Sequence, residues 1–351
     1  MNFKIKLFDF SDAEAYNIFL NRNKLFLWYV SLEYKLLLEK YLRSESKYWL
    51  VYNKNQIIAC LPTFLSENDK FGTILNSLPF YGSNGSFLLD FELSIENKFT
   101  AMELLLNELQ IFSEKEKISA ITLITNPLDK ESNLFLNSNF KYDFQDYRIG
   151  QVTPLLRDVD SLISIFENPR PRNIRKAIKL GVKISTSKSE EDFDFLFNTH
   201  HDNMLTIGGQ LKPKRFFEYV QKYISANNYK LYIATLNGEK IAALLLFYFN
   251  DTVEYFTPAT VTEFRNTQSS SLMIYLAMQD AADLGFSNWN WGGTWETQKG
   301  VYDFKKKWGA ENKKYFYFTK IYNQDLLNKS SDELLKNYPN FYTLPFNQLK
   351  N

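Results

Sequence analysis

The sequence is poor in the residues that build cross-linked or metal-centred proteins. Its 351 residues include one cysteine, Cys60, and two histidines, which are adjacent. A single cysteine excludes a disulfide framework, and this set of residues leaves no Cys/His pattern for a metal ion. We therefore expect no metal site and an activity that does not depend on redox state.

Long hydrophobic runs and an excess of charge are also missing. No run of 18 apolar residues occurs, and the stretch MNFKIKLFDFSD carries charges where a secretion signal needs an apolar core. Lys and Arg number 41 against 40 for Asp and Glu, which argues against a protein that coats nucleic acid. These absences predict a cytoplasmic protein with no transmembrane segment and no DNA partner.

What the chain does contain is a repeated pattern. Residues 48–65, YWLVYNKNQIIACLPTFL, are typical of a strand, a polar turn and a strand, and residues 230–249, KLYIATLNGEKIAALLLFYF, repeat this with an Asn-Gly turn. Each hairpin follows helical periodicity and precedes a strand, a helix and a further strand. The matching segments are 13–41 and 191–227, 72–78 and 252–257, 96–113 and 269–284, and 118–125 and 286–292.

The copies lie about 180 residues apart, which predicts two mixed α/β units in one chain. A chance likeness between generic α/β patterns is the alternative. A hydrophobic content of 45% is ample for two packed cores. We expect a first domain at 1–150, a second at 151–323, and a C-terminal extension at 324–351 that belongs to neither copy.

Four stretches carry a resemblance to a known family. They are NSLPFYGSNGS at 76–86, RPRNIRKAIKLGVKI at 170–184, MLTIGGQLKPKRFFEYV at 204–220 and WNWGGTWETQKGVYDFKKKWGA at 289–310. Together they resemble the Fem-type (FemABX-like) acyltransferases, which carry two acyl-CoA N-acyltransferase (GNAT) units in tandem. The resemblance implies two GNAT-like units with a cleft between them, the first on the acceptor side and the second performing acyl transfer.

Two features of that group are absent. The pyrophosphate loop of GNAT proteins, Gln/Arg-x-x-Gly-x-Gly/Ala, is replaced by EFRNTQSSSLMIYL at 263–276, and no long charged helical arm is inserted. The missing loop argues against the standard mode of acetyl-CoA binding, whereas the missing arm discriminates little between the two donors found across the group, acyl-CoA and aminoacyl-tRNA. Both would be substrates, so we expect no bound cofactor.

Acyl transfer to an amine can proceed by direct attack, without a protein nucleophile. It needs positioned reactants, a stabilised oxyanion and removal of a proton from the amine. The chain fits this scheme because it has no Gly-x-Ser-x-Gly motif, and Cys60 lies within the apolar strand pattern IIACL. Cys60 is therefore interpreted as core and not as a reactive thiol.

The catalytic candidates are Lys305, Tyr302 and His200. The resemblance maps a Phe-Lys pair of the family onto Phe304 and Lys305, and implies that this lysine offsets charge on the carbonyl oxygen. A solvated lysine on a helix face is the alternative. Tyr302 is a candidate proton donor to the leaving group or a structural residue, and His200 is a candidate general base or a half-exposed helix histidine.

The donor-binding candidates are a glycine pair and a serine cluster. Gly292 and Gly293 follow an apolar strand and let a backbone approach a ligand, although a plain turn needs them equally. Ser269, Ser270 and Ser271 open an apolar helix where free N–H groups attract an anion, although ordinary capping explains them as well.

Two further groups are candidates for substrate binding. Arg172, Arg175, Lys176 and Lys179 recur at i, i+3, i+4 and i+7, and this stripe would suit phosphates or be merely solvated. The loop residues Phe80, Tyr81, Ser83 and Asn84 form a candidate acceptor edge or a simple connection between strands.

The sequence therefore predicts an amide-forming acyltransferase acting on an amine of a cell-envelope precursor. The acceptor would be an amino sugar nucleotide for polysaccharide synthesis or a peptidoglycan peptide, and acyl-CoA the favoured donor. The alternatives are a peptidoglycan bridge transferase that uses aminoacyl-tRNA, and a GNAT-fold binding module without catalytic activity.

Overall fold

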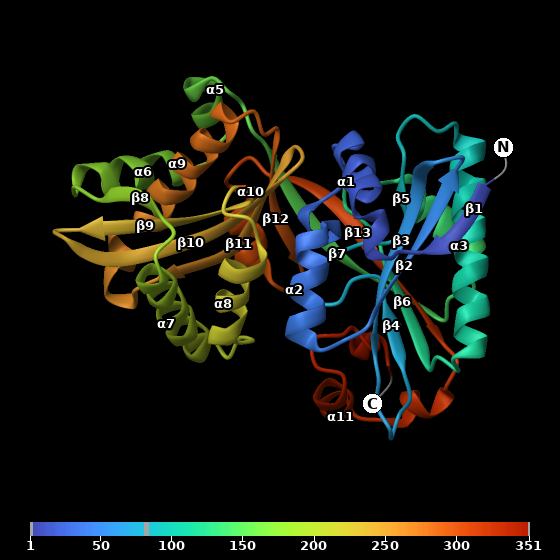
Figure 1. Ribbon diagram of the computed structural model, residues 1–351. Coiled ribbons are helices and arrows are strands. Elements are labelled where there is room, and N and C mark those ends of the chain that lie inside the picture. Colours follow the sequence, from blue (N-terminus) through green and yellow to red (C-terminus); the bar gives the residue numbers. More distant parts are fainter. Residues whose placement is uncertain (1–2, 81–83, 350–351) are drawn as a thin grey trace. The chain divides into compact units, whose positions relative to one another are not determined.

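The chain folds as two compact units, shown in the ribbon diagram of the computed structural model (Figure 1). Residues 3–80 and 84–349 are described. Unit 1 comprises Met1–Arg148 and Lys314–Asn351, and unit 2 comprises Ile149–Lys313. Unit 1 is therefore built from both ends of the chain.

This division places the C-terminal part differently from the expected domains. The segment 324–351, expected to stand apart from both copies, lies in unit 1. Residues 314–323, expected in the second domain, lie in unit 1 as well. They belong to a strand that pairs with unit 1, as described below.

Unit 1 contains six strands in one order, with a short seventh at the side. Its sheet runs β1-β2-β3-β4-β6-β13, and β5 pairs with β3. The strands are β1 (Phe3–Leu7), β2 (Ser46–Asn53), β3 (Gln56–Ser66), β4 (Ile74–Asn76), β5 (Leu88–Leu89), β6 (Ala120–Ile124) and β13 (Glu311–Ile321). The helices are α1 (Ala13–Arg22), α2 (Leu32–Leu42), α3 (Ile95–Lys115), α4 (Glu131–Asn139) and α11 (Ser331–Asn337).

Unit 2 has a sheet with the order β8-β9-β10-β11-β12-β7. Its strands are β7 (Phe144–Pro154), β8 (Lys183–Ser187), β9 (Tyr229–Leu236), β10 (Glu239–Phe249), β11 (Thr252–Thr260) and β12 (Asn288–Thr294). Its helices are α5 (Val159–Ser164), α6 (Arg170–Lys179), α7 (Glu190–Ile207), α8 (Lys214–Tyr223), α9 (Ser269–Asp283) and α10 (Lys299–Lys306).

The two sheets repeat one pattern of pairing. In unit 1, β1 to β4 pair antiparallel in turn, β4 pairs parallel with β6, and β6 pairs antiparallel with β13. In unit 2, β8 to β11 pair antiparallel in turn, β11 pairs parallel with β12, and β12 pairs antiparallel with β7. The prediction of two related mixed α/β units is confirmed, whereas the cleft expected between them stays a prediction.

The equivalence also shows an exchange of strands. By its place after β6 and α4, β7 corresponds to β13, which follows β12 and α10. Each of these strands completes the sheet of the other copy, because residues from Ile149 onward lie in unit 2 and residues from Lys314 onward lie in unit 1. Each exchanged strand covers an edge that would otherwise expose unpaired backbone groups.

Local sequence explains the hairpins but not every helix boundary. Asn237 and Gly238 have φ values of 52° and 86°, the left-handed pair that a tight hairpin turn requires. The periodic stretch 191–227 forms two helices, α7 and α8, because Gly208 adopts φ 65° and ends the first.

In unit 2, α6 and α9 lie on one face of the sheet and α7 and α8 on the other (Figure 1). The core beneath α6 and α9 includes Trp289, Trp291 and Trp308, which are at most 3% exposed. Trp289 and Trp291 therefore pack as core residues on one face of β12, which leaves the end of that strand to the glycine pair.

Candidate active site

In unit 2, the neighbouring strands β11 and β12 are paired over only part of their length. Pairing between β11 and β12 stops at Glu254 and Asn290, although β11 continues to Thr260 and β12 to Thr294. A register shift in the pairing of β10 with β11, beside Leu245, accompanies the change. Backbone groups of both strands beyond this point are available to something other than each other.

The glycine pair forms the free end of β12. Asn290 and Gly293 are three positions apart, whereas their partners on β7, Val152 and Gly150, are two positions apart, so β12 bulges here. Gly292 takes up the bulge with φ 70°, and a Cβ built on it would meet no atom within 4 Å. Its glycine is required by backbone conformation, and the space in front of it is open.

Lys305 of α10 reaches this strand end. Its Nζ donates to Thr294 Oγ1 at 2.7 Å and to the carbonyls of Gly293 at 3.1 Å and Gly292 at 3.3 Å. The side chain is buried, with 6% of the residue exposed, and burial lowers the pKa of its amine to about 8. Three neutral oxygens thus hold an ammonium whose pKa is close to neutrality.

The neighbouring polar groups are linked to this ammonium. Thr294 Oγ1 in turn donates to Gln151 Oε1 of β7 at 3.5 Å, and Gln151 Nε2 donates to the carbonyl of Tyr302 at 3.2 Å. The phenol of Tyr302 accepts from Asn312 Nδ2 at 3.0 Å, which leaves its own proton available for donation. Lys305 and the backbone of Tyr302 are therefore linked through Thr294 and Gln151.

In unit 1, hydrogen bonds bridge the ends of β4 and β6, the strands that correspond to β11 and β12. The Ser77 N–H donates to the carbonyl of Thr122 at 2.9 Å, and the Ile124 N–H donates to Ser77 Oγ at 2.7 Å. The Gly85 N–H then takes up the carbonyl of Ile124 at 3.2 Å. These bonds bridge the gap after β4 and β6, so the opening seen in unit 2 is sealed in unit 1.

Sequence reasoning missed a buried carboxylate at the point of divergence. Glu254 is 1% exposed, and its Oε2 accepts from Asn290 Nδ2 at 2.9 Å. Asn290 Oδ1 accepts from the Gly292 N–H at 3.0 Å, so the pair supports the bulge. The signal lay in the polar residues of TVEYF and WNW, which interrupt otherwise apolar strands.

Arg170 was missed as well. It is 8% exposed and its Nη2 donates to the Phe304 carbonyl at 3.1 Å, one residue before Lys305. Arg170 precedes Ile174 by four positions and Ala177 by seven, and both are buried. The apolar stripe of α6 therefore extends back to Arg170, and this spacing could have revealed it.

The serines open α9 as expected, but its cap is different. Gln268 is the N-cap residue, with φ 63° and no capping bond from its side chain. The Ser269 N–H donates to Thr267 Oγ1 at 3.3 Å, and Ser270 Oγ lies 2.6 Å from Thr260 Oγ1 at the end of β11. Ser269 and Ser271 are buried. The role of all three in donor binding stays a prediction.

The basic stripe of α6 faces solvent. Arg172, Arg175, Lys176 and Lys179 are exposed, while Ile174 and Ala177 pack into the core. The four cations therefore share one accessible side of the helix, the geometry that phosphate binding requires. Exposure alone does not distinguish this from a solvated face, so the role stays a prediction.

His200 lies on the other face of the sheet, on α7. It is 3% exposed, its ring is 6.2 Å from that of Phe217, and neither ring nitrogen has a hydrogen-bond partner. Burial, with help from the positive charge of Lys212, lowers the pKa of its imidazole to about 4. A half-exposed position was one expectation for His200, and the structure contradicts it: His200 is buried and neutral at pH 7. Its role as a base stays a prediction.

The acceptor-edge candidates lie in unit 1. Tyr81 and Ser83 fall outside the described residues. Phe80 has φ 81°, and its N–H donates to the carbonyl of Asn340 at 2.8 Å. Asn84 is 4% exposed, and its Oδ1 accepts no hydrogen bond from the residues that the structure describes. The connection is thus tied to the C-terminal segment, while its part in acceptor binding stays a prediction.

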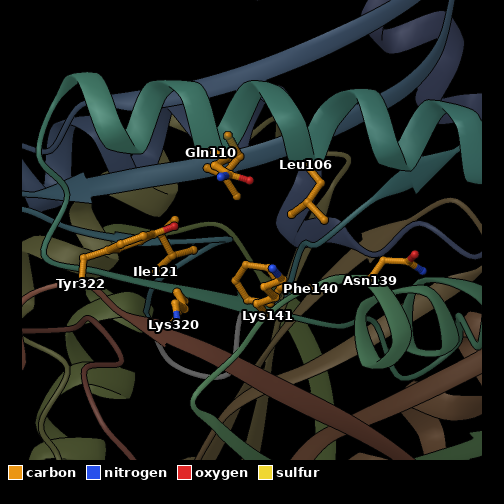
Figure 2. A pocket seen from close by; sticks show the side chains of 9 residues that line it. Leu106, Gln110, Ile121, Asn139, Phe140, Lys141, Lys320 and Tyr322 are labelled. Atoms are coloured by element: carbon orange, nitrogen blue, oxygen red, sulfur yellow. The ribbon is translucent and has the colours of Figure 1, made fainter.

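Unit 1 also contains a pocket, which none of the candidate site residues lines (Figure 2). About 190 Å³ is enclosed beneath α3, with Leu106 and Gln110 above and Phe140, Lys320 and Tyr322 around it. Lys320 is already paired with Asp143 at 3.1 Å. The pocket contains no cluster of reactive groups, and we assign it no part in the chemistry.

The described part of the chain lacks two kinds of feature, a cluster of metal ligands and a membrane-spanning helix. Among residues 3–80 and 84–349, no group of three His, Cys, Asp or Glu side chains is placed to hold a metal ion. Over the same residues, no helix has the length and apolar character needed to cross a membrane. Metal independence stays a prediction.

Comparison with known proteins gives the site its context. Residues 171–306 match the family described as acetyltransferase (GNAT) domain. The crystal structure of FemX is similar to this chain with a TM-score of 0.73 at 15% identity, over 93% of this chain and 99% of that one. No curated protein matches the sequence.

Two other solved structures have the same architecture. A tandem GNAT protein from the clavulanic acid biosynthesis pathway gives a TM-score of 0.53 at 10% identity, over 91% of this chain and 98% of that one. The C-terminal domain of a putative lysylphosphatidylglycerol synthetase from Agrobacterium fabrum gives 0.55 at 10% identity, over 93% and 96%. Residues 171–306 thus match a GNAT domain, and the repeated fold of the whole chain is the fold of FemX and of a tandem GNAT protein.

Proposed function

We propose that this protein transfers an acyl group to an amine of a cell-envelope precursor, with the chemical step at the open end of β12 in unit 2. The observation that carries the proposal is the buried ammonium of Lys305 at that strand end. A buried, unpaired cation is costly, and such groups cluster where charge must be stabilised in a reaction.

The chemistry follows from what Lys305 can donate. An amine nitrogen attacks the acyl carbonyl, a C–N bond forms, and the carbonyl oxygen becomes an oxyanion. The leaving group, a thiol or a ribose hydroxyl, then departs as the carbonyl re-forms. The longest of the three hydrogen bonds that Lys305 Nζ donates is the one to the Gly292 carbonyl, at 3.3 Å. We infer that the oxyanion takes over this donor, since a charged acceptor competes well with a neutral one.

Two proton movements remain. The amine nitrogen must lose a proton as it forms the C–N bond, and the leaving group must gain one. Tyr302 is our candidate for the second, because its phenol accepts from Asn312 and keeps its proton for donation. His200 is the candidate of the sequence analysis for the first. It lies on α7, on the opposite face of the sheet from α6 and α9.

The donor is proposed to enter where β11 and β12 diverge. The open backbone at Gly292 and the start of α9 at Ser269 border the ends of these strands, and α9 begins next to the end of β11. Acyl-CoA is the favoured donor, and the related tandem GNAT structure is described with reference to AcCoA. Aminoacyl-tRNA is the second donor, because one structural relative is described as a lysylphosphatidylglycerol synthetase domain.

Unit 1 is proposed to hold the acceptor and not a second donor. Among its described residues, Ser77 and Gly85 bridge the ends of the strands that correspond to β11 and β12. The acceptor would be an amino sugar nucleotide or a peptidoglycan peptide. The basic stripe of unit 2 that begins at Arg172 is proposed to bind phosphates of the donor or of the acceptor. Both donors and these precursors are cytoplasmic molecules, which is why we place the protein in the cytoplasm.

A direct experiment tests the proposal. Purified protein is incubated with acetyl-CoA, longer acyl-CoA thioesters or aminoacyl-tRNA, each with a mixture of amino sugar nucleotides and peptidoglycan precursor peptides. Mass spectrometry should reveal one acceptor that gains an acyl mass. Metabolites of a deletion strain, compared with its parent, should lose the same product and accumulate its precursor.

The controls separate the alternatives. Lys305→Met protein should lose the product, whereas Lys306→Met protein should retain it. If wild type binds an acceptor but modifies none with either donor class, the binding-module alternative holds and the acyl-transfer proposal fails.

A further inference from the structure

The buried guanidinium at the start of α6 is not used by the chemistry described above. Arg170 is 8% exposed, whereas Arg172 and Arg175 on the same helix face solvent. Burial lowers the pKa of its guanidinium, and the phenol of Tyr255 acts in the opposite direction. The described residues form no ion pair with it, so something other than a carboxylate must compensate for its burial.

Two aromatic rings and a carbonyl provide that compensation. The guanidinium carbon lies 4.2 Å from the ring centre of Phe304 and 5.2 Å from that of Trp308. Nη2 donates to the Phe304 carbonyl at 3.1 Å. A planar guanidinium can stack on rings while it donates in its own plane, which a lysine cannot do.

The carbonyl that Arg170 binds would otherwise lack a helical partner. At the end of α10 the Trp308 N–H donates to the carbonyl of Lys305 at 3.0 Å, one residue later than an α-helical bond would require. The Phe304 carbonyl is thereby left for Arg170. The Glu167 N–H donates to the Lys307 carbonyl at 3.0 Å. The segment from Glu167 to Arg170 therefore caps the last turn of α10.

Lys305 lies on that capped turn, between the two captured carbonyls. Its chain must cross from α10 to β12, where it contacts Gly292, Gly293 and Thr294. None of these three residues titrates. A positive charge at a helix C-terminus is favourable, and here it also fixes the turn from which Lys305 extends.

We propose that Arg170 is a positioning residue for acyl transfer: it clamps the last turn of α10 through Phe304 and Trp308 and thereby holds the Lys305 ammonium, dry and aligned, at the end of β12. The inference rests on the proposed function of Lys305 for its meaning in catalysis. The clamp itself is a property of the folded chain and can be measured without a substrate.

The test is the pKa of Lys305 in the full-length protein. Its rate of acetylation by acetic anhydride is followed against pH by peptide mass spectrometry, in wild type and in Arg170→Met. Loosening the turn admits water to the ammonium, so the pKa should rise from about 8 by at least one unit toward its ordinary value. The charged and titratable side chains around this turn include those of α10 and its end, Tyr302, Asp303, Lys306 and Lys307, together with Glu167, Arg170 and Tyr255.

Arg172→Met is the matched control, because it removes an exposed arginine from the same helix and should leave the Lys305 pKa unchanged. Arg170→Lys keeps the charge without the fork and should give a smaller rise; it decides the matter if Arg170→Met does not fold. An unchanged Lys305 pKa in a folded Arg170 variant overturns the clamp. Once turnover is available, Arg170→Met should lower kcat with little change in KM, and an active Lys305→Met would refute the proposed function while leaving the clamp intact.

Discussion

The ammonium of Lys305 and the hydroxyl of Thr294 lie 2.7 Å apart at the end of a strand whose neighbour has turned away. This bond joins the helix α10 to the bulged tip of β12. It fixes a cation where the strand pairing has ended and the backbone is open. Among the described residues of unit 1, Ser77 bridges the equivalent strands.

Removing the cation should slow the chemical step. Lys305→Met keeps the aliphatic stem and the helix propensity, so the fold should survive. Loss of an oxyanion donor costs about 2.7–4 kcal/mol, or roughly 100- to 1,000-fold in kcat, with less effect on KM. Lys306→Met and Lys307→Met control for general positive charge and should each cost less than about tenfold. Equal small effects at all three positions would remove Lys305 from the mechanism.

The rate should depend on pH through the same group. Burial lowers the pKa of Lys305 to about 8, so the ammonium form prevails below that pH and is lost above it. If the cation stabilises the oxyanion, kcat is level below pH 8 and falls tenfold per unit well above it. A rate that instead rises through pH 8 would mean that neutral Lys305 acts as the base. The pH profile of Lys306→Met should coincide with wild type.

His200 makes a prediction about stability. Its folded pKa of about 4 lies below the ordinary value of 6.5, so between these values the unfolded chain binds a proton that the folded chain does not. Stability is therefore present above pH 6.5 and falls as the pH drops toward 4, by about 3 kcal/mol in total. His200→Phe, suited to its aromatic neighbours, should lack this loss in urea titrations at pH 7, 5.5 and 4.

The same His200 variant tests the general base. A stable His200→Phe protein that turns over within about tenfold of wild type leaves the histidine a buried structural residue. A loss near 100-fold or more would favour proton transfer, because general bases typically contribute about 100- to 10,000-fold.

The basic stripe should affect binding and not folding. Reversing the charges of Arg172 and Arg175 removes two exposed cations, so the melting temperature should hardly change. If they bind phosphates, each lost contact should weaken the binding free energy of the phosphate-bearing substrate by about 1.5–3 kcal/mol, which is measured as a higher KM. Lys183 and Lys188 are exposed elsewhere in unit 2, and reversing them controls for the overall field. An unchanged KM would make the stripe a solvated face.

The sequence by itself determined the parts that depend on local physical chemistry. Hairpins were predictable because Asn237 and Gly238 favour left-handed backbone, and the apolar strands and long helices because their periodicity is strong. Lys305 and the glycine pair were found from the sequence of residues 289–310 and its family resemblance. The structure places Lys305 in contact with Gly293, while their roles in donor binding and catalysis stay predictions.

Tertiary structure decided whatever depends on partners distant in the chain. The exchange of β7 and β13 could not be predicted, because an apolar strand carries no mark of the edge it will cover. Glu254 and Arg170 appeared as ordinary charged residues until packing buried them beside Asn290 and Phe304. His200 likewise received its lowered pKa from burial by elements that local sequence does not specify. Periodicity predicts which face of an element is apolar, but burial and charge depend on what the fold brings against that face.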